Sequence, residues 1–228
     1  MPHTNTLSPS SAQMPAIRFV PVMHLQTGQT HTLLAETDKR FEERAVFGRA
    51  AIATESGFGG SPSPAEWLAD QIEAIAIDAH YSIAERPVIV PAPLAAIADE
   101  NVAIACDAAI RRTHLCPQEI CIEISDSALA ASSCDAQRAI EALRRRGFRV
   151  SLDATKSWQS PLSGAMRLLF ESMRIDARHL SYEAALEDRV EAATASGMSV
   201  VAEHAAWRDG DYLGSLGIDY CLRPRLDA

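Results

Sequence analysis

The chain has 228 residues, of which 47% are hydrophobic and 22% charged, so it can bury the core of one large domain. Its formal net charge of -9 leaves no basic stripe, which argues against nucleic acid and anionic membrane surfaces as partners. No apolar run approaches the roughly 20 residues needed to cross a bilayer. We therefore expect a soluble protein without a membrane partner.

The five cysteines are odd in number and lack Cys-x-x-Cys spacing. Nothing at the N-terminus has the charged-then-apolar pattern of a signal peptide. Both observations predict a reducing, cytoplasmic location. Residues 1–15 are rich in Ser, Thr, Pro and Gln and have little to bury, so we expect a disordered leader before a single domain over residues 16–228.

From Ile17 onward, short aliphatic runs alternate with helical patterns, an order that favours parallel strands joined by crossover helices. The chain predicts eight strands, which suggest a closed (β/α)₈ barrel. The strands are Arg18–Leu25, Thr30–Ala35, Val88–Val90, Glu119–Ser125, Phe148–Asp153, Met173–Asp176, Ser199–Glu203 and Ile218–Leu222. Only a Thr27-Gly28 turn separates the first two strands, a connection compatible with an antiparallel pair.

The helical segments have recognisable starts. In Ser63-Pro64-Ala65-Glu66 a capping box coincides with proline at the first helical position. A second helix is expected to begin near Ser133 or Asp135 and to end before Gly147, and a third to run from about Ser181 to Ser196.

Carboxylates recur at the carboxyl ends of the predicted strands. Glu123, Asp153 and Glu203 each come late in a strand and alternate with the aliphatic residues, and Arg174 and Asp176 share this phase in a fourth strand. If the aliphatic residues meet the helices, these side chains face the barrel lumen. Catalytic groups of (β/α)₈ barrels lie at this rim. One such carboxylate is more often a turn former, but four strands in phase favour a shared site.

Five motifs in order resemble the EAL-domain family of cyclic di-GMP phosphodiesterases. The segment Phe19–Leu25 with Thr27-Gly28 resembles the family's Q-P-I-x-D-L…T-G, although Val20 stands where glutamine is expected. The other four motifs are L-E-I-T-E-S, L-D-D, L-K-I-D and V-A-E-G-V-E, and they correspond in order to Ile122–Ser127, Leu152–Ala154, Met173–Asp176 and Val201–Ala206. The resemblance implies an EAL-type barrel over roughly Ile17 to the C-terminus.

The resemblance also implies a reaction with two divalent metals held by carboxylates, and this chain departs from that ligand set. The family's name-giving glutamate falls on Leu34, with Glu36 displaced along the strand, and Asp38 replaces an arginine that faces the nucleotide. The family's Q-G-Y after the last strand is absent. Four positions where the family has an oxygen ligand are now Leu34, Pro91, Ala154 and Ala206.

The remnant of the family's site is Glu123, Asp153, Arg174, Asp176 and Glu203, with Asp126 in place of the loop-supporting glutamate and Arg174 in place of the catalytic lysine. Arginine keeps the charge but cannot release a proton in the working range. We favour a buried salt-bridge cluster over a metal site whose ligands would be Glu123, Asp153 and Glu203. Trp158, in the loop after Asp153, is expected to meet Leu34 and to close the mouth.

The leading hypothesis is a non-catalytic EAL-like regulatory protein that acts through an unidentified protein partner in bacterial signalling, with no catalytic residues, no cofactor and weak or absent binding of cyclic di-GMP. The first alternative is a sensor that binds cyclic di-GMP without turnover. The second is a weak phosphodiesterase, which alone would need Mg²⁺ or Mn²⁺.

Overall fold

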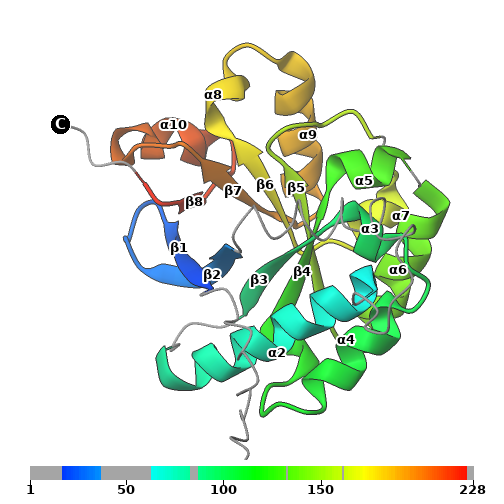
Figure 1. Ribbon diagram of the computed structural model, residues 1–228. Helices are drawn as coiled ribbons and strands as arrows, with labels where there is room; N and C mark the ends of the chain where they lie inside the picture. Colours follow the sequence, from blue (N-terminus) through cyan, green and yellow to red (C-terminus); the bar gives the residue numbers. More distant parts are fainter. Residues whose placement is uncertain (1–16, 37–62, 83–86, 132, 161, 225–228) are drawn as a thin grey trace, which may run out of the picture.

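The structure is a computed structural model that describes residues 17–36, 63–82, 87–131, 133–160 and 162–224. Eight strands form a closed barrel in chain order, with each strand next to its sequence neighbour and β8 next to β1 (Figure 1). The strands are β1 Arg18–His24, β2 Thr30–Glu36, β3 Val88–Ala92, β4 Ile120–Ser125, β5 Arg149–Ala154, β6 Ser172–Asp176, β7 Ser199–Glu203 and β8 Tyr220–Leu222. All eight predicted strands are present, with small shifts at their ends.

Strand β1 runs against both of its neighbours, whereas β2 to β8 are parallel. Arg18 pairs with Glu36 of β2, and Val22 pairs with Leu222 of β8. The connection between β1 and β2 is short, and Gly28 within it has a φ of +66°, which favours glycine. The antiparallel start expected from the Thr27-Gly28 turn is confirmed.

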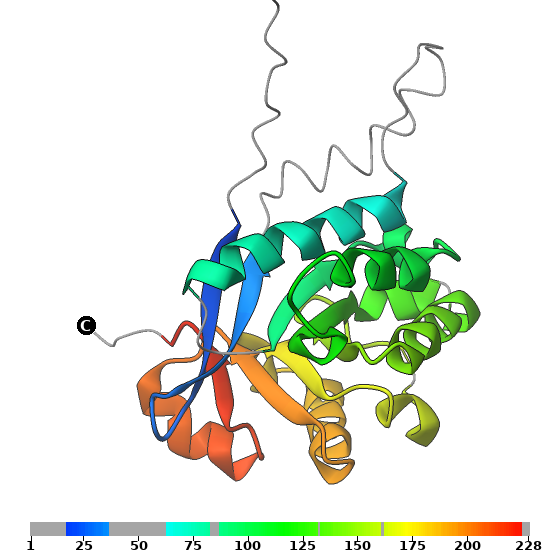
Figure 2. The same ribbon diagram turned by 90° about the horizontal axis from the view of Figure 1, so that it is seen from below.

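Helices pack around the outside of the barrel, and α2 lies alongside α4 (Figures 1 and 2). The helices and 3₁₀ turns are α2 Pro64–Ser82, α3 Leu94–Ile97, α4 Val102–Ile110, η1 Pro117–Glu119, α5 Asp126–Ala131, α6 Ser133–Arg145, α7 Gly164–Arg167, α8 Ala177–Leu180, α9 Ala184–Ala195, η2 Trp207–Asp209 and α10 Gly210–Ser215. This arrangement leaves the carboxyl ends of β2 to β8 at one rim of the barrel, which we call the mouth.

Helix α2 begins as the sequence predicts. The backbone N–H of Glu66 donates to Ser63 Oγ at 3.2 Å, and the backbone N–H of Ser63 donates to Glu66 Oε2 at 2.7 Å. Helix α9 begins at Ala184, three residues later than expected from Ser181. The reason is the short helix α8, which Asp176 caps by accepting from the backbone N–H of Arg178 at 3.0 Å.

Alternation along the strands separates two apolar clusters. Ile120, Ile122 and Ile124 of β4 point outward and belong to the large cluster between barrel and helices. Cys121 of the same strand belongs to a second cluster, which fills the barrel interior and which we call the lumen cluster. The lumen cluster consists of Val20, Val22, Leu34, Ile89, Cys121, Val201 and Leu222. The barrel is therefore packed with aliphatic side chains below its mouth.

Two expectations fall on residues that the structure does not describe. The leader over residues 1–15 and the aspartate at position 38 both lie outside the described ranges. Among the described residues, no helix has both the length and the apolar character that a membrane span requires.

Candidate functional site

Four charged side chains from four neighbouring strands meet at the mouth. Arg174 of β6 donates from Nε to Glu123 Oε1 at 2.9 Å and from Nη2 to Glu123 Oε2 at 2.6 Å. Its Nη2 also lies 3.0 Å from Asp153 Oδ2, and its Nη1 donates to Glu203 Oε1. We call Glu123, Asp153, Arg174 and Glu203 the Arg174 cluster.

Strand register explains why these residues meet. In the parallel sheet Asp153 pairs with Arg174, and Glu123 pairs with Ser151, two residues before Asp153. Glu203 follows Val201, the partner of Arg174, by two residues. All four side chains alternate with outward aliphatic residues, so each points into the barrel near its carboxyl end. The sequence pattern therefore placed these four residues together correctly.

The Arg174 cluster is largely removed from water. The side chain of Glu123 is 2% exposed and that of Arg174 11% exposed. Burial raises the pKa of Glu123, and the adjacent Arg174 opposes this shift only in part. For Arg174, burial works toward a lower pKa, but the three carboxylates, Glu123 above all, raise it, so the guanidinium stays charged. One fixed cation thus lies among three carboxylates at the mouth and offsets only part of their formal negative charge.

Asp176, which the sequence grouped with this remnant, makes a separate set of contacts. Its carboxylate accepts from the Arg178 side chain at 2.6–3.1 Å and lies 3.2 Å from His204 Nδ1. Burial works toward a higher pKa, but the hydrogen bonds from Arg178 outweigh it and lower the pKa of Asp176. His204 has a φ of +57°, an unusual conformation for a residue other than glycine. Asp176 therefore fixes the chain after β6 and β7.

Asp126 holds the loop that follows β5. Its fully buried carboxylate accepts from Ser157 Oγ at 2.8 Å and from the backbone N–H groups of Gln159 and Ser160 at 3.0 and 3.3 Å. Arg189 of α9 donates to Asp126 and also to the carbonyl oxygens of Trp158 and Ser160, at 3.0 and 2.7 Å. These contacts agree with the loop-supporting position that the resemblance implied for Asp126.

Sequence reasoning missed Arg189, although a signal was present. Arg189 lies three residues after Leu186 and four before Ala193, both buried on the inner face of α9. A charged residue within a buried helical stripe requires a partner, and here the partner is Asp126.

The positions that lack the family's oxygen ligands are closed to solvent or apolar. Leu34 is 3% exposed within the lumen cluster, and Ala154 and Ala206 are buried. Pro91 pairs with Glu123 in the sheet, so it occupies the third strand at the level of the Arg174 cluster. Glu36, displaced along β2, accepts from Arg223 Nη2 at 2.8 Å and does not belong to the cluster.

The expected contact between Trp158 and Leu34 is wrong. Leu34 packs in the lumen cluster, whereas Trp158 packs against the outer apolar cluster. The Trp158 ring lies 5.4 Å from the His179 ring, centroid to centroid. The hydrogen bond from Arg189 to the Trp158 carbonyl, which the sequence did not predict, holds the loop on the α9 side.

The described residues do not fit the two metals of the family's reaction. Oxygens of Glu123, Asp153 and Glu203 are engaged by the Arg174 guanidinium, so a cation of fixed position already lies among them. Within the part of the chain that the structure describes, no three His, Cys, Asp or Glu side chains are grouped as ligands of a metal ion. We therefore derive no step through a metal.

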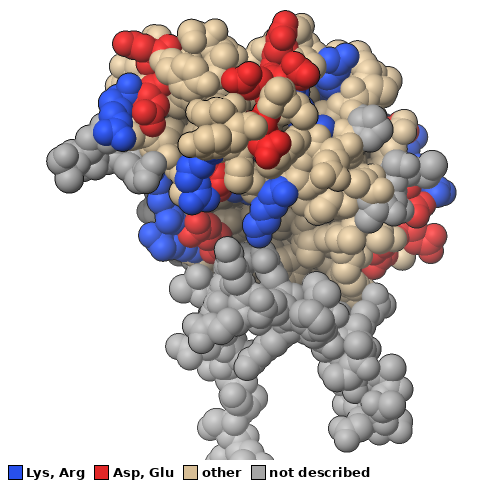
Figure 3. Space-filling view, turned by 90° about the horizontal axis from the view of Figure 1, so that it is seen from above, with Lys and Arg blue, Asp and Glu red and all other residues tan. Residues whose placement is uncertain are grey.

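Charges of both signs are interspersed on the side of the molecule that carries α8 and α10. Figure 3 shows this side, where basic groups lie beside acidic ones and neither forms a continuous stripe. Such a face offers no extended electrostatic track for a polyanion.

Comparison with known proteins agrees with the motif order and the barrel. A model of the family described as the EAL domain matches residues 12–221. The chain belongs to the EAL domain family. No curated protein matches the chain.

Solved structures of EAL proteins share the fold at low sequence identity. The chain is 16% identical to the structure described as the PaMucR phosphodiesterase in complex with c-di-GMP, with a TM-score of 0.68 and coverage of 92% of this chain and 89% of that chain. It is 12% identical to the FimX EAL domain, with a TM-score of 0.68 and coverage of 92% and 88%.

A third structure is longer than this EAL domain. It is the Klebsiella pneumoniae BlrP1 complex with calcium and cyclic di-GMP, at 15% identity and a TM-score of 0.71. The alignment covers 92% of this chain and 54% of BlrP1, so the chain spans about half the length of that protein.

Proposed function

We propose that this EAL domain is a regulatory module of bacterial signalling that does not hydrolyse cyclic di-GMP and acts by binding another protein. The observation that carries the proposal is the placement of the Arg174 guanidinium among Glu123, Asp153 and Glu203. Metal-assisted hydrolysis needs open coordination positions and a complete ligand set, and a buried arginine leaves neither.

Two further features support the proposal. The lumen cluster places buried Leu34 where the family has its name-giving glutamate, and Pro91 offers no side-chain oxygen. A nucleotide that relied on the family's polar contacts would meet aliphatic surface at these positions. Weak or absent binding of cyclic di-GMP follows from the loss of these contacts.

A turnover assay tests the proposal directly. The purified chain is incubated with cyclic di-GMP and either Mg²⁺ or Mn²⁺, and the linear dinucleotide is followed by chromatography. We expect no product from the wild type or from Leu34→Glu, because groups that act as a unit are not restored one at a time. Metal-dependent product that disappears in Glu123→Ala would refute the proposal.

Calorimetry with cyclic di-GMP separates this function from the sensor alternative. We expect a dissociation constant weaker than about 1 μM, which corresponds to about -8 kcal/mol. Tighter binding without turnover would instead establish a nucleotide sensor. Thermal unfolding with Mn²⁺ or with EDTA adds a measurement that is independent of activity, and we expect the same unfolding temperature in both.

A further inference from the structure

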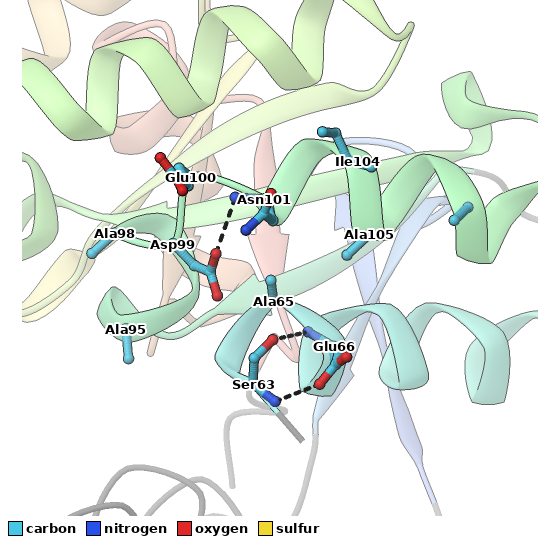
Figure 4. A pocket seen from close by; sticks show the side chains of 11 residues that line it. Ser63, Ala65, Glu66, Ala95, Ala98, Asp99, Glu100, Asn101, Ile104 and Ala105 are labelled. Carbon is cyan, nitrogen blue, oxygen red and sulfur yellow. Dashed lines mark hydrogen bonds between the residues drawn. The ribbon is translucent and has the colours of Figure 1, made fainter. Parts of the chain in front are cut away.

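A hollow outside the barrel opens between the beginnings of α2 and α4, beside the turn that follows α3, a helix that begins just after the carboxyl end of β3. It has a volume of about 980 Å³, and alanines, including Ala65, Ala95, Ala98 and Ala105, line much of it (Figure 4). We call it the α2–α4 hollow. Side chains of this size let a second backbone approach closely, which suits a peptide segment better than a small polar ligand.

Aliphatic side chains project at and beside this hollow. Ile104 lines it and is 56% exposed, and Leu94, the first residue of α3, is 44% exposed. Large exposed aliphatic residues that adjoin a concave apolar surface are typical of protein-binding sites.

The polar part of the hollow is acidic. Glu66, Asp99 and Glu100 line it, and none of its lining residues within the described part of the chain is Lys or Arg. Glu66 is oriented by its bond from the Ser63 backbone, and Asp99 accepts from the backbone N–H of Asn101 at 3.0 Å (Figure 4). None of these three carboxylates has an ion-pair partner within the described ranges. Two of the three negative charges are therefore held in place by backbone donors.

A neighbouring hollow shows that this excess of acidic over basic side chains is local. The space between α4 and α6 shares Asp99 and Glu100 with the first hollow but is also lined by Arg138 and Arg145. Charges of both signs line the neighbour, whereas every charged side chain that lines the α2–α4 hollow among the described residues is acidic. A partner that complements it must bring positive charge as well as apolar surface.

We infer that the α2–α4 hollow docks a basic amphipathic helix of a partner protein. Aliphatic side chains of that helix would pack on the alanines and against Ile104, while Lys or Arg one turn away would reach Glu66 and Asp99. The inference deepens the proposed function and rests on it, because it names the surface and the partner chemistry through which a binding module would act.

The test uses a synthetic peptide as the probe. A peptide of about 14 residues with Leu and Lys in an amphipathic helical pattern is labelled, and its binding to the full chain is followed by fluorescence anisotropy. Two comparison peptides have the same composition in scrambled order or Glu in place of Lys. We expect binding of the patterned basic peptide to be at least about tenfold tighter than that of either comparison.

Matched variants assign the binding to the hollow. Ile104→Asp, and the double variant Glu66→Gln with Asp99→Asn, should each weaken binding about tenfold. The double variant keeps a side-chain oxygen at each position that can accept from the backbone N–H groups of Ser63 and Asn101. The controls are Ile77→Asp, exposed to 61% on α2 outside the hollow, and the double variant Glu187→Gln with Asp211→Asn, which removes two acids from the first turns of α9 and α10. Circular dichroism and thermal unfolding confirm that each variant folds.

Equal weakening by the control variants would show nonspecific attraction to an acidic protein and would overturn the inference. Equal binding of the scrambled peptide would do the same. Sedimentation equilibrium adds a further outcome, because self-association that Ile104→Asp abolishes would assign the hollow to a second copy instead. Peptide binding at the hollow together with cyclic di-GMP hydrolysis would refute the proposed function alone, so the two failures are distinguishable.

Discussion

Arg174 and Glu123 form a two-bond pair at the mouth, with Nε to Oε1 at 2.9 Å and Nη2 to Oε2 at 2.6 Å. In this geometry two N–H groups of the planar guanidinium each donate to one oxygen of the same carboxylate. Lysine has a single ammonium group and cannot form such a planar pair of bonds. Where the family pattern has lysine, this chain therefore has a residue suited to holding carboxylates together.

Removing Arg174 should destabilise the fold strongly. Arg174→Met leaves the nearly buried Glu123 without its cation, so we expect a loss of about 3–5 kcal/mol in the free energy of unfolding, measured in urea. Arg111→Met is the control, because Arg111 is 76% exposed and pairs with Asp107 on the surface of α4, and it should cost less than about 1 kcal/mol. Similar losses in both variants would contradict the structural role of the Arg174 cluster.

An acidic residue at position 34 should also lower the free energy of unfolding. Leu34→Glu places a carboxylate within the lumen cluster, and an unpaired buried charge costs about 3–5 kcal/mol of unfolding free energy. Leu34→Met keeps the apolar character and volume and should cost less than about 1.5 kcal/mol. Denaturant unfolding of both variants checks the difference, and a Glu variant as stable as wild type would show that water or a cation reaches this position.

Arg189 should control the order of the loop after β5. Arg189→Met removes its bonds to Asp126 and to the carbonyls of Trp158 and Ser160. We expect faster hydrogen exchange at the amides of Gln159 and Ser160, and altered Trp158 fluorescence, with α2 unaffected. Arg138→Met, an exposed helix pair with Asp135, is the control. Unchanged exchange in Arg189→Met would show that Asp126 alone holds the loop.

Asp176 should contribute to stability in a pH-dependent way. Its pKa is lowered from 3.8 in the folded chain, so its contribution is present above that value and is lost as pH falls through the folded pKa. Asp176→Asn keeps the cap but loses the charge. We expect it to be less stable than wild type at about pH 6 and the difference to shrink at about pH 3, as measured by urea unfolding at both values. A difference independent of pH would contradict this account.

Much of the barrel followed from the sequence because two periodicities are strong in this chain. The alternation in Ile120–Ser125 fixed which side of β4 meets the helices, and the same phase in three other strands brought Glu123, Asp153, Arg174 and Glu203 together. Local caps were equally informative, as in the first turn of α2.

What the sequence did not reveal depends on side-chain partners between distant segments. Asp126 and Arg189 are 63 positions apart, and only the packing of α9 beside the loop after β5 makes them neighbours. The error at Trp158 has the same origin, because its backbone carbonyl is held by Arg189 while its ring meets His179. Local patterns do not encode such contacts.

The antiparallel direction of β1 also determines at which rim the chain enters the barrel. Arg18, at the beginning of β1, lies beside Glu36 at the carboxyl end of β2, and β8 runs toward the same rim. The polypeptide therefore enters and leaves through one rim, whereas an all-parallel barrel receives its first strand from the opposite rim. A fluorescent protein or affinity tag joined just before Arg18 or just after Leu222 would therefore attach on the mouth side of the barrel and not on the opposite side.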